Sequence, residues 1–330
     1  MKKIVVDKFN ANKKFFKFIK DVLPGMRNAE IFKLIRKGIV KVDDKSVDNN
    51  YILKEGDVVI FYLADFHFEK KGKKSDNKFQ SVSSNLNIVF EDKDLLVVNK
   101  PAGLLLHPNN KEYKNCISET VKAYLYKKNE YDPENFFTPS PAHRLDTNTS
   151  GVVVIPKNQS ALKDVNEQFR LRTTRKIYVA LIFGKIENKI LITSSIDSRE
   201  NKENKVIVQD TKILNLIPDK EVFIQNNKLL SATVVNPIKY NKKVTLAEIE
   251  LWTGKKHQIR AQLNSIKSPL LGDMKYFTPE SFSFSQKYGL KGYFLHGYKL
   301  KLEGYEEFVS PIPENFKTAI SLFFSNDTSF

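Results

Sequence analysis

Residues 143–151 read HRLDTNTSG and lead directly into the apolar run VVVI. The stretch places one carboxylate, Asp146, beside the cation Arg144 and follows it with small hydroxyl residues and Gly151. The apolar run indicates a buried strand, and the small residues before it predict a tight turn in which glycine permits the close approach of another part of the chain. We therefore expect a loop that holds a single aspartate at the edge of a sheet.

The segments on both sides of this stretch predict a mainly β domain. Short apolar runs alternate with turn residues, and three longer segments show apolar residues at helical spacing. The predicted strands lie within residues 87–100, 150–156, 176–186, 230–240, 244–254 and 293–303, and the predicted helices at 117–128, 160–170 and 256–266. We expect a mostly antiparallel, mixed sheet in a catalytic domain that spans residues 86–330.

The first 64 residues predict a separate small α/β module. Apolar residues recur at helical spacing in residues 15–23 and 28–37, and short extended runs follow them. Residues 1–60 hold 14 Lys and Arg against 8 Asp and Glu, which is typical of a surface that binds a polyanion. Residues 65–85 are polar and charged, so we expect a flexible basic linker there. The sequence thus predicts an α+β protein of two domains.

Composition and missing motifs narrow the chemistry. The formal net charge of +16 makes nucleic acid the expected partner. A single cysteine, Cys116, cannot form an intrachain disulfide, and no stretch is long and apolar enough to span a membrane, so we expect a soluble, cytoplasmic protein. No GxGxxG, GxxxxGK[ST], GxSxG or HExxH pattern occurs. We therefore expect neither a metal nor a small-molecule cofactor.

Six motifs, in this order, resemble those of the RluA-type pseudouridine synthases. The resemblance spans about residues 86–310, and its HRLDxxTSG element is the most specific part. The motifs are NKPAGLLLHP (99–108), HRLDTNTSGVVVIPKN (143–158), RKIYVALIFG (175–184), TGKKHQIRAQL (253–263), PLLGDMKYF (269–277) and LHGYKL (295–300). The segment MRNAEIFKLIRKGIVKVDDKSVDNNYILKEGDVV is similar to the S4 type of RNA-binding module. Together they resemble the RluC- and RluD-like branch, which implies a cofactor-free isomerase of specific uridines in large-subunit ribosomal RNA.

The resemblance also implies which residues act. Asp146 would be the catalytic carboxylate, and whether it attacks C1′ or removes the C2′ proton stays open. Arg260 of HQIR would keep Asp146 ionised, because a nearby cation favours the charged form of a buried carboxyl, and its planar fork suits two hydrogen bonds to a carboxylate. Tyr178 would pack on the target base and assist removal of the C5 proton. Arg144 would either fill the place of a flipped-out uridine or contact a phosphate or an acidic side chain.

Three further residues of the matched motifs, His107, Lys255 and His257, are expected to bind substrate. His143 lies beside the predicted strand, where a lone histidine is typically a structural residue, so we leave it out of the catalytic set. Large-subunit ribosomal RNA, or its assembling particle, is the expected partner, and we expect the protein to be a monomer.

Two other functions stay open at this point. A non-catalytic rRNA-binding or ribosome-assembly factor would keep the same fold, but it would have little need of Asp146, Tyr178 and Arg260 together. A glycosidase-like hydrolase requires a second carboxylate as general acid, and the sequence shows no evident partner for Asp146.

Overall fold

The structure is a computed structural model that describes residues 1–7, 10–23, 26–63, 77–109, 112–133, 137–201 and 205–324. The chain divides into two compact units. The first comprises Met1–Ser81 and Asn129–Thr138, and the second comprises Val82–Lys128 and Pro139–Phe330. The linker that we expect at residues 65–85 falls largely on residues 64–76, which lie outside the described residues. The limits of the two domains therefore stay predictions.

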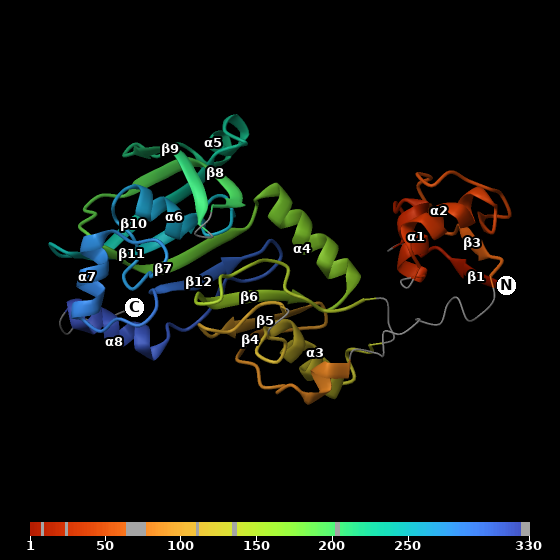
Figure 1. The fold of residues 1–330 in the computed structure, drawn as a ribbon, viewed down its shortest axis with the longest axis horizontal. Helices are drawn as coiled ribbons and strands as arrows, with labels where there is room; N and C mark the ends of the chain where they lie inside the picture. The colour runs from red at the N-terminus through yellow and green to blue at the C-terminus, as the bar shows by residue number, and fades with distance from the viewer. Residues whose placement is uncertain are drawn as a thin grey trace. The chain divides into compact units, whose positions relative to one another are not determined.

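The first unit contains a three-stranded antiparallel sheet and two helices that pack on it (Figure 1). The amphipathic spacing of its N-terminal segments explains this packing, because one face of each helix is buried on the sheet. The strands lie in the order β1 (Lys2–Val5), β3 (Val58–Phe61) and β2 (Val40–Val42), and the helices are α1 (Phe15–Val22) and α2 (Asn28–Arg36), with a short 3-10 helix at Asn77–Ser81.

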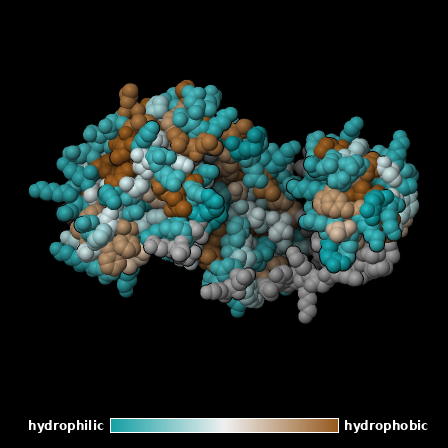
Figure 2. Space-filling view, turned by 45° about the horizontal axis from the view of Figure 1, so that its top comes forward, coloured by the Kyte–Doolittle hydropathy of each residue, from teal (hydrophilic) through white to brown (hydrophobic). Residues whose placement is uncertain are grey.

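The two helices of the first unit also contact each other. The rings of Phe16 and Phe32 stack with their centroids 4.5 Å apart. Helix α2 ends before Gly38, whose φ of 60° is the left-handed conformation that commonly follows a helix end. Figure 2 shows mainly hydrophilic residues on the viewed face of each unit, interrupted by smaller hydrophobic patches.

The second unit is built on a ten-stranded sheet. Neighbouring strands are antiparallel except for β6 and β12, which are parallel, so the sheet is mixed. In sheet order the strands are β4 (Ile88–Glu91), β5 (Leu95–Lys100), β6 (Ser150–Pro156), β12 (Leu295–Lys301), β7 (Arg175–Phe183), β11 (Val244–Leu251), β10 (Ser231–Tyr240), β8 (Ile190–Glu200) and β9 (Val206–Leu214), and β13 (Phe308–Val309) pairs with β12.

Helices cover both faces of this sheet. Helix α4 packs on β5 and β6 through Ala161 and Val165 (Figure 1), whereas α8 packs on Val179 and Leu181 of β7. Because side chains alternate along a strand, Tyr178 faces away from α8. The helices are α3 (Ile117–Lys127), α4 (Gln159–Leu171), α5 (Lys220–Asn226), α6 (Gln258–Ser265), α7 (Pro279–Lys287) and α8 (Glu314–Phe323). None of the described helices has the length and apolar character needed to cross a membrane.

Glycine at position 151 is required by the pairing of β6 with β12. Gly151 has a φ of 128°, and a Cβ atom there would lie 2.3 Å from the carbonyl oxygen of Gly297. The next pair along the two strands is Ser150 and His296, whose Oγ and Nδ1 atoms are hydrogen-bonded at 2.9 Å. This close approach fixes the end of the HRLDTNTSG loop against the middle of the sheet.

The α+β class and the mostly antiparallel, mixed sheet are confirmed. Strands β8 and β9 and helices α5, α7 and α8 were not among the predicted elements. In β9 most side chains are exposed or half-buried, so the strand lacks the apolar run that marks a buried strand in a sequence.

Candidate active site

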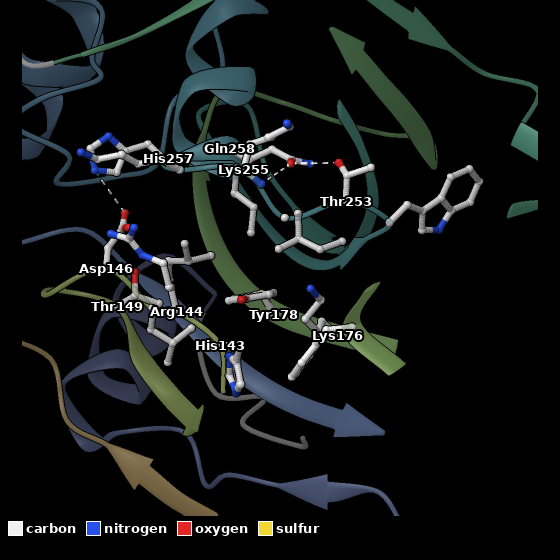
Figure 3. Close-up of a pocket in the computed structure, with 18 of the residues that line it drawn as sticks. His143, Arg144, Asp146, Thr149, Lys176, Tyr178, Thr253, Lys255, His257 and Gln258 are labelled. Atoms are coloured by element: carbon white, nitrogen blue, oxygen red, sulfur yellow. Dashed lines mark hydrogen bonds and ion pairs between the residues drawn. The ribbon is translucent and has the colours of Figure 1, made fainter. Parts of the chain in front are cut away.

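A cleft of about 700 Å³ opens beside the HRLDTNTSG loop (Figure 3). Its walls come from five parts of the chain: the loop before β6, the C-terminal end of α4, the start of β7, the segment that joins β11 to α6, and the start of β12. Asp146 lies on one wall with its side chain 26% exposed, and no other described residue that lines the cleft carries a carboxylate. The lining cations are Arg144, Arg172, Lys176, Lys255, Lys256 and Arg260. The cleft is therefore strongly positive apart from one aspartate.

Arg260 connects Asp146 to a second aspartate. Its Nη1 donates to Asp146 Oδ2 at 2.9 Å. Its Nε and Nη2 donate to the two oxygens of Asp273 at 2.7 and 3.0 Å. The side chains of Arg260 and Asp273 are only 8% and 1% exposed. Burial alone would lower the pKa of Arg260, but the hydrogen bonds and charge of Asp273 outweigh it and raise the pKa above its usual value, so the guanidinium stays charged.

The geometry differs in one respect from the expected pairing. The two-pronged contact that we expected between Arg260 and Asp146 is made to Asp273 instead, and Asp146 receives a single hydrogen bond. Asp273 is also a second carboxylate close to Asp146, which the sequence did not reveal. It accepts two further bonds at Oδ1 from the backbone N–H groups of Lys275 and Tyr276. Both oxygens of Asp273 are thus engaged by Arg260 and the backbone, so its evident part in the site is to hold Arg260 in place.

Aromatic rings enclose the guanidinium of Arg260. Its Cζ lies 4.4 Å from the ring centroid of Tyr293 and 5.1 Å from that of Tyr276, which are cation–π distances. The Tyr293 hydroxyl is hydrogen-bonded to Thr149 Oγ1 at 3.1 Å, and Thr149 N donates to the Asp146 carbonyl at 3.0 Å. The aspartate loop and its counter-ion are thus held by one connected set of contacts.

His257 is the other nitrogen-bearing side chain close to Asp146. Its Nε2 lies 3.9 Å from Asp146 Oδ2, as the dashed line in Figure 3 marks, and its Nδ1 is hydrogen-bonded to the Tyr276 hydroxyl at 3.0 Å. Burial lowers the pKa of His257, and the charge of Asp146 opposes that shift. At neutral pH the ring is therefore mainly neutral, and Arg260 supplies the positive charge beside Asp146.

Tyr178 projects from β7 into the same cleft (Figure 3). It is 7% exposed. Burial, and then the negative charge of Asp146, raise the pKa of its hydroxyl above the usual value, so the phenol is protonated at neutral pH. On the neighbouring strand β12 its partner is Gly297, where a Cβ would lie 3.6 Å from the ring of Tyr178.

A buried lysine holds the other side of the aspartate loop. Lys100 is 0% exposed, and its Nζ donates to the carbonyls of Pro101, Leu104 and Thr147 at 2.9, 2.8 and 2.7 Å. Burial lowers the pKa of Lys100 to about 8, although the charge of Asp146 opposes this. Because Thr147 follows Asp146 directly, these bonds position the backbone of the aspartate.

A second cleft, of about 820 Å³, adjoins the first. The two share Arg144, Asp146, His257 and Arg260 among their lining residues. Arg144 is exposed and makes no ion pair with any described residue, so the acidic contact that we considered for it is not seen. His107 lines the second cleft. Burial and the charge of Arg144 lower the pKa of His107.

The remaining predicted residues lie at the edges of the site. Lys255 is exposed on the wall opposite β7. His143 Nε2 accepts a hydrogen bond from Val154 N at 3.1 Å, and burial, with the charge of Lys176, lowers the pKa of His143 to about 3. His143 is therefore neutral and bonded to strand β6. Among the described residues, no group of three or more His, Cys, Asp and Glu side chains is arranged to hold a metal ion.

Sequence analysis assigned no role to several residues of this site. Asp273 and Tyr276 lie within the quoted PLLGDMKYF motif, but nothing in their spacing indicates that both contact Arg260. Tyr293 carries no motif signal. Lys176 stands two residues before Tyr178, and period-two alternation does place the two side chains on one face of the strand. The sequence therefore predicts that Lys176 faces the same side of the sheet as Tyr178.

Two family models match the chain. The model of RNA pseudouridylate synthase matches residues 94–265, and the model of the S4 domain matches residues 17–59. The first match covers half of the chain and includes Asp146, Tyr178 and Arg260. The second lies in the first structural unit.

Similar proteins carry names that agree with these two family matches. An uncharacterised RNA pseudouridine synthase of Mycoplasma capricolum is 32% identical over 283 residues, which cover 84% of this chain and 85% of the relative. Ribosomal large subunit pseudouridine synthase C of Vibrio vulnificus is 28% identical over 299 residues, which cover 90% of this chain and 86% of the relative.

Solved structures show the same fold. Human RNA pseudouridylate synthase domain containing 4 superposes with a TM-score of 0.52 at 23% identity, covering 75% of this chain and 95% of that one. Human RNA pseudouridylate synthase domain containing 1 superposes with a TM-score of 0.51 at 20% identity, covering 69% and 84%.

The fold, the motifs and these matches define an RNA-modifying isomerase with an S4 domain before its catalytic domain. The chain belongs to the RNA pseudouridylate synthase family, in its RluA-type branch. It is therefore a pseudouridine synthase, and the non-catalytic alternative is not favoured.

Proposed function

We propose that this enzyme converts uridines of large-subunit ribosomal RNA to pseudouridine, with Asp146 as the catalytic carboxylate. In this isomerisation the bond from N1 of the base to C1′ breaks, the base turns, and C5 forms a new bond to C1′. C5 then loses its proton and N1 gains one, so atoms and electrons balance within the nucleoside and its solvent. No oxidant, reductant or nucleotide is consumed.

The observation that carries the proposal is the single carboxylate of the cleft, Asp146, hydrogen-bonded to Arg260. The carboxylate either attacks C1′ or accepts the C2′ proton, and both routes require the ionised form. Arg260 supplies a positive charge and one hydrogen bond to this carboxylate. Asp273 holds Arg260 in place and leaves Nη1 directed at Asp146. The charge of the site is thus arranged before the substrate binds.

Tyr178 and Arg144 have separate parts in the proposal. The ring of Tyr178 packs on the uracil, and its neutral hydroxyl relays the C5 proton to water, so that the phenol ends with one proton as it began. A uridine within paired or stacked RNA must leave its stack to reach Asp146. Arg144 is exposed, lines both clefts and has no ion-pair partner among the described residues, which supports a role in filling the vacated position. His107, His257 and Lys255 contact the RNA around the target.

Large-subunit RNA is the proposed target because two features agree. Relatives named for a particular RNA include ribosomal large subunit pseudouridine synthases, and the S4 match lies in a basic segment of the chain. In this proposal the first unit docks on the RNA and the second presents its cleft to the uridine. The proposed location of the protein is the cytoplasm.

The target is tested with transcripts tritiated at uridine C5, because formation of pseudouridine releases that tritium to water. We expect the intact protein to release tritium from a large-subunit rRNA transcript, or from a precursor particle that carries it, at no more than a few sites. A small-subunit transcript of matched uridine content is the control. Preferential release from the small-subunit transcript would refute the proposed target, and absence of release from every ribosomal RNA would refute ribosomal RNA as substrate.

A further inference from the structure

The cleft extends beyond Tyr178 to a group of cations, two of which, Lys176 and Arg172, have no part in the function proposed above. Lys176, Arg172 and Lys255 line this end. In Figure 3, Tyr178 lies between Asp146 and Lys176. Successive side chains on one face of a strand are about 6.8 Å apart, which is the length scale of one nucleotide in a single strand. A group bound at Lys176 would thus be a near neighbour of a base held at Tyr178.

Lys176 is an unusual lysine because it is half-buried and has no carboxylate partner among the described residues. Burial, and then the charges of Lys220 and Arg172, lower the pKa of Lys176 to about 8. Its Nζ lies 5.4 Å from the ring centroid of Phe169, a cation–π contact that offsets only part of the cost of burial. A lysine with a purely structural role would be expected to have bonded acceptors, as Lys100 has in three carbonyls, and no acceptor for Lys176 Nζ is seen among the described residues.

The neighbours of Lys176 leave its ammonium accessible from the cleft. At Gly254 an added Cβ would lie 3.4 Å from Lys176 Nζ, so a side chain at that position would crowd the ammonium. Arg172 follows α4 in a left-handed conformation with φ 61°, and its side chain makes no ion pair with a described residue. Lys255 stands across the cleft. These cations leave a place for one anion, and the RNA backbone carries one anionic phosphate per nucleotide.

We propose that Lys176, Arg172 and Lys255 bind a backbone phosphate of the RNA strand beside the uridine held at Asp146. The inference rests on the proposed function in that RNA is the occupant of this cleft. It extends that function by assigning to the cleft a second subsite, for a phosphodiester, which orients the strand so that its neighbouring nucleoside meets Tyr178 and Asp146.

The first test separates binding from chemistry. Lys176→Met should raise KM for the tritiated large-subunit transcript about 10- to 100-fold, as expected for loss of a charged hydrogen-bonding partner, with kcat changed less than threefold. Lys176→Arg should restore most of the affinity, because it keeps the charge. Lys163→Met is the matched control, since Lys163 is an exposed lysine of α4 outside the cleft. A fall in kcat at unchanged KM would show that Lys176 acts on the base, and would overturn the proposal.

The second test locates the phosphate. Oligoribonucleotides that contain the target uridine are synthesised with a single neutral methylphosphonate linkage. The linkage is placed in turn at each position on either side of the target uridine. At one position the neutral linkage should weaken binding to the intact enzyme about 10-fold or more. The same linkage should have little effect on binding to Lys176→Met, because that variant already lacks the ammonium that would contact the phosphate. Equal losses in both proteins at every linkage would overturn the phosphate subsite. Failure of the intact enzyme to form pseudouridine in the oligonucleotide with natural phosphodiester linkages, or in its parent transcript, would instead refute the proposed function.

Discussion

Asp273 engages two of the three nitrogens of the Arg260 guanidinium, Nε at 2.7 Å and Nη2 at 3.0 Å, and leaves Nη1 for Asp146. A guanidinium that met Asp146 alone would be free to turn about its own side chain. The buried second carboxylate removes that freedom, so Arg260 presents one fixed donor to the aspartate. The site thus contains a chain of three charged groups, of which Asp146 is the most exposed, at 26% against 8% for Arg260 and 1% for Asp273.

Asp273→Asn tests this arrangement. The substitution keeps the shape of the side chain but removes the charge that fixes Arg260, and breaking a buried ion pair typically lowers the free energy of unfolding by about 3 kcal/mol. We expect kcat to fall about 10- to 100-fold while KM stays nearly constant. The reason is that a small displacement of Arg260 moves the donor that positions Asp146, and such displacements strongly reduce the rate of a reaction. Asp210→Asn, at an exposed position with φ 52° that asparagine tolerates, is the control. Wild-type turnover by Asp273→Asn would show that Arg260 needs no second partner.

Tyr178→Phe separates the ring from the hydroxyl. The ring should still pack on the base, so RNA binding should stay within about threefold of the intact enzyme. Turnover should fall about 10²-fold if the hydroxyl assists proton removal, a typical contribution of such a group. Tyr240→Phe, at an exposed tyrosine on β10, is the control. Undiminished turnover by Tyr178→Phe would restrict Tyr178 to packing.

The close contact between β6 and β12 predicts that alanine substitutions at two facing glycines differ in their effect on stability. Gly151→Ala places a Cβ 2.3 Å from Gly297 O at a φ of 128°, and we expect it to lower the free energy of unfolding by about 2–4 kcal/mol. Gly297→Ala meets only contacts of 3.6 Å and should change it by less than about 1 kcal/mol. Urea unfolding of both variants checks this. Equal stability would mean that the two strands separate at little cost.

The buried charge of Lys176 predicts a pH-dependent gain in stability. The pKa of Lys176 is about 8 in the folded protein and about 10.4 in an unfolded chain, so below pH 8 the folded protein bears the full cost of the buried cation. Lys176→Met should therefore raise the Tm of the second unit at pH 7, by roughly 2–4 °C per kcal/mol recovered. The gain should shrink as the pH rises from 8 to 10, because the lysine then loses its proton on folding. A gain that grows with pH would contradict this account.

The basic N-terminal module predicts a change in salt dependence. A variant lacking residues 1–64 should bind the large-subunit transcript more weakly, and the logarithm of its affinity should fall less steeply with the logarithm of salt concentration, because fewer phosphates are contacted. Filter binding over a salt series measures both quantities. Identical affinity and slope would rule out a docking role for the module.

Comparison of sequence and structure shows where pattern recognition stops. The strand after HRLDTNTSG and the α+β class followed from apolar periodicity, and motif resemblance brought forward Asp146 and Arg260, which lie 114 residues apart and hydrogen-bond in the structure. The role of Asp273 could not be predicted, because a lone aspartate in a loop carries no spacing signal and its contact with Arg260 depends on how α6 packs on the sheet. Lys176 was missed for a different reason, since a lysine at the start of a strand is ordinarily a solvated residue.

The central claim is that the ionised Asp146 carboxylate carries the reaction. Asp146→Asn keeps the size and hydrogen-bonding shape of the side chain but removes its charge. Tritium release from the C5-tritiated large-subunit transcript is measured for the intact enzyme and for this variant at protein concentrations that saturate the RNA, with binding checked in parallel. The account predicts binding within a few-fold of the intact enzyme and release slower by more than about 10³-fold. Release at a comparable rate by Asp146→Asn would contradict it.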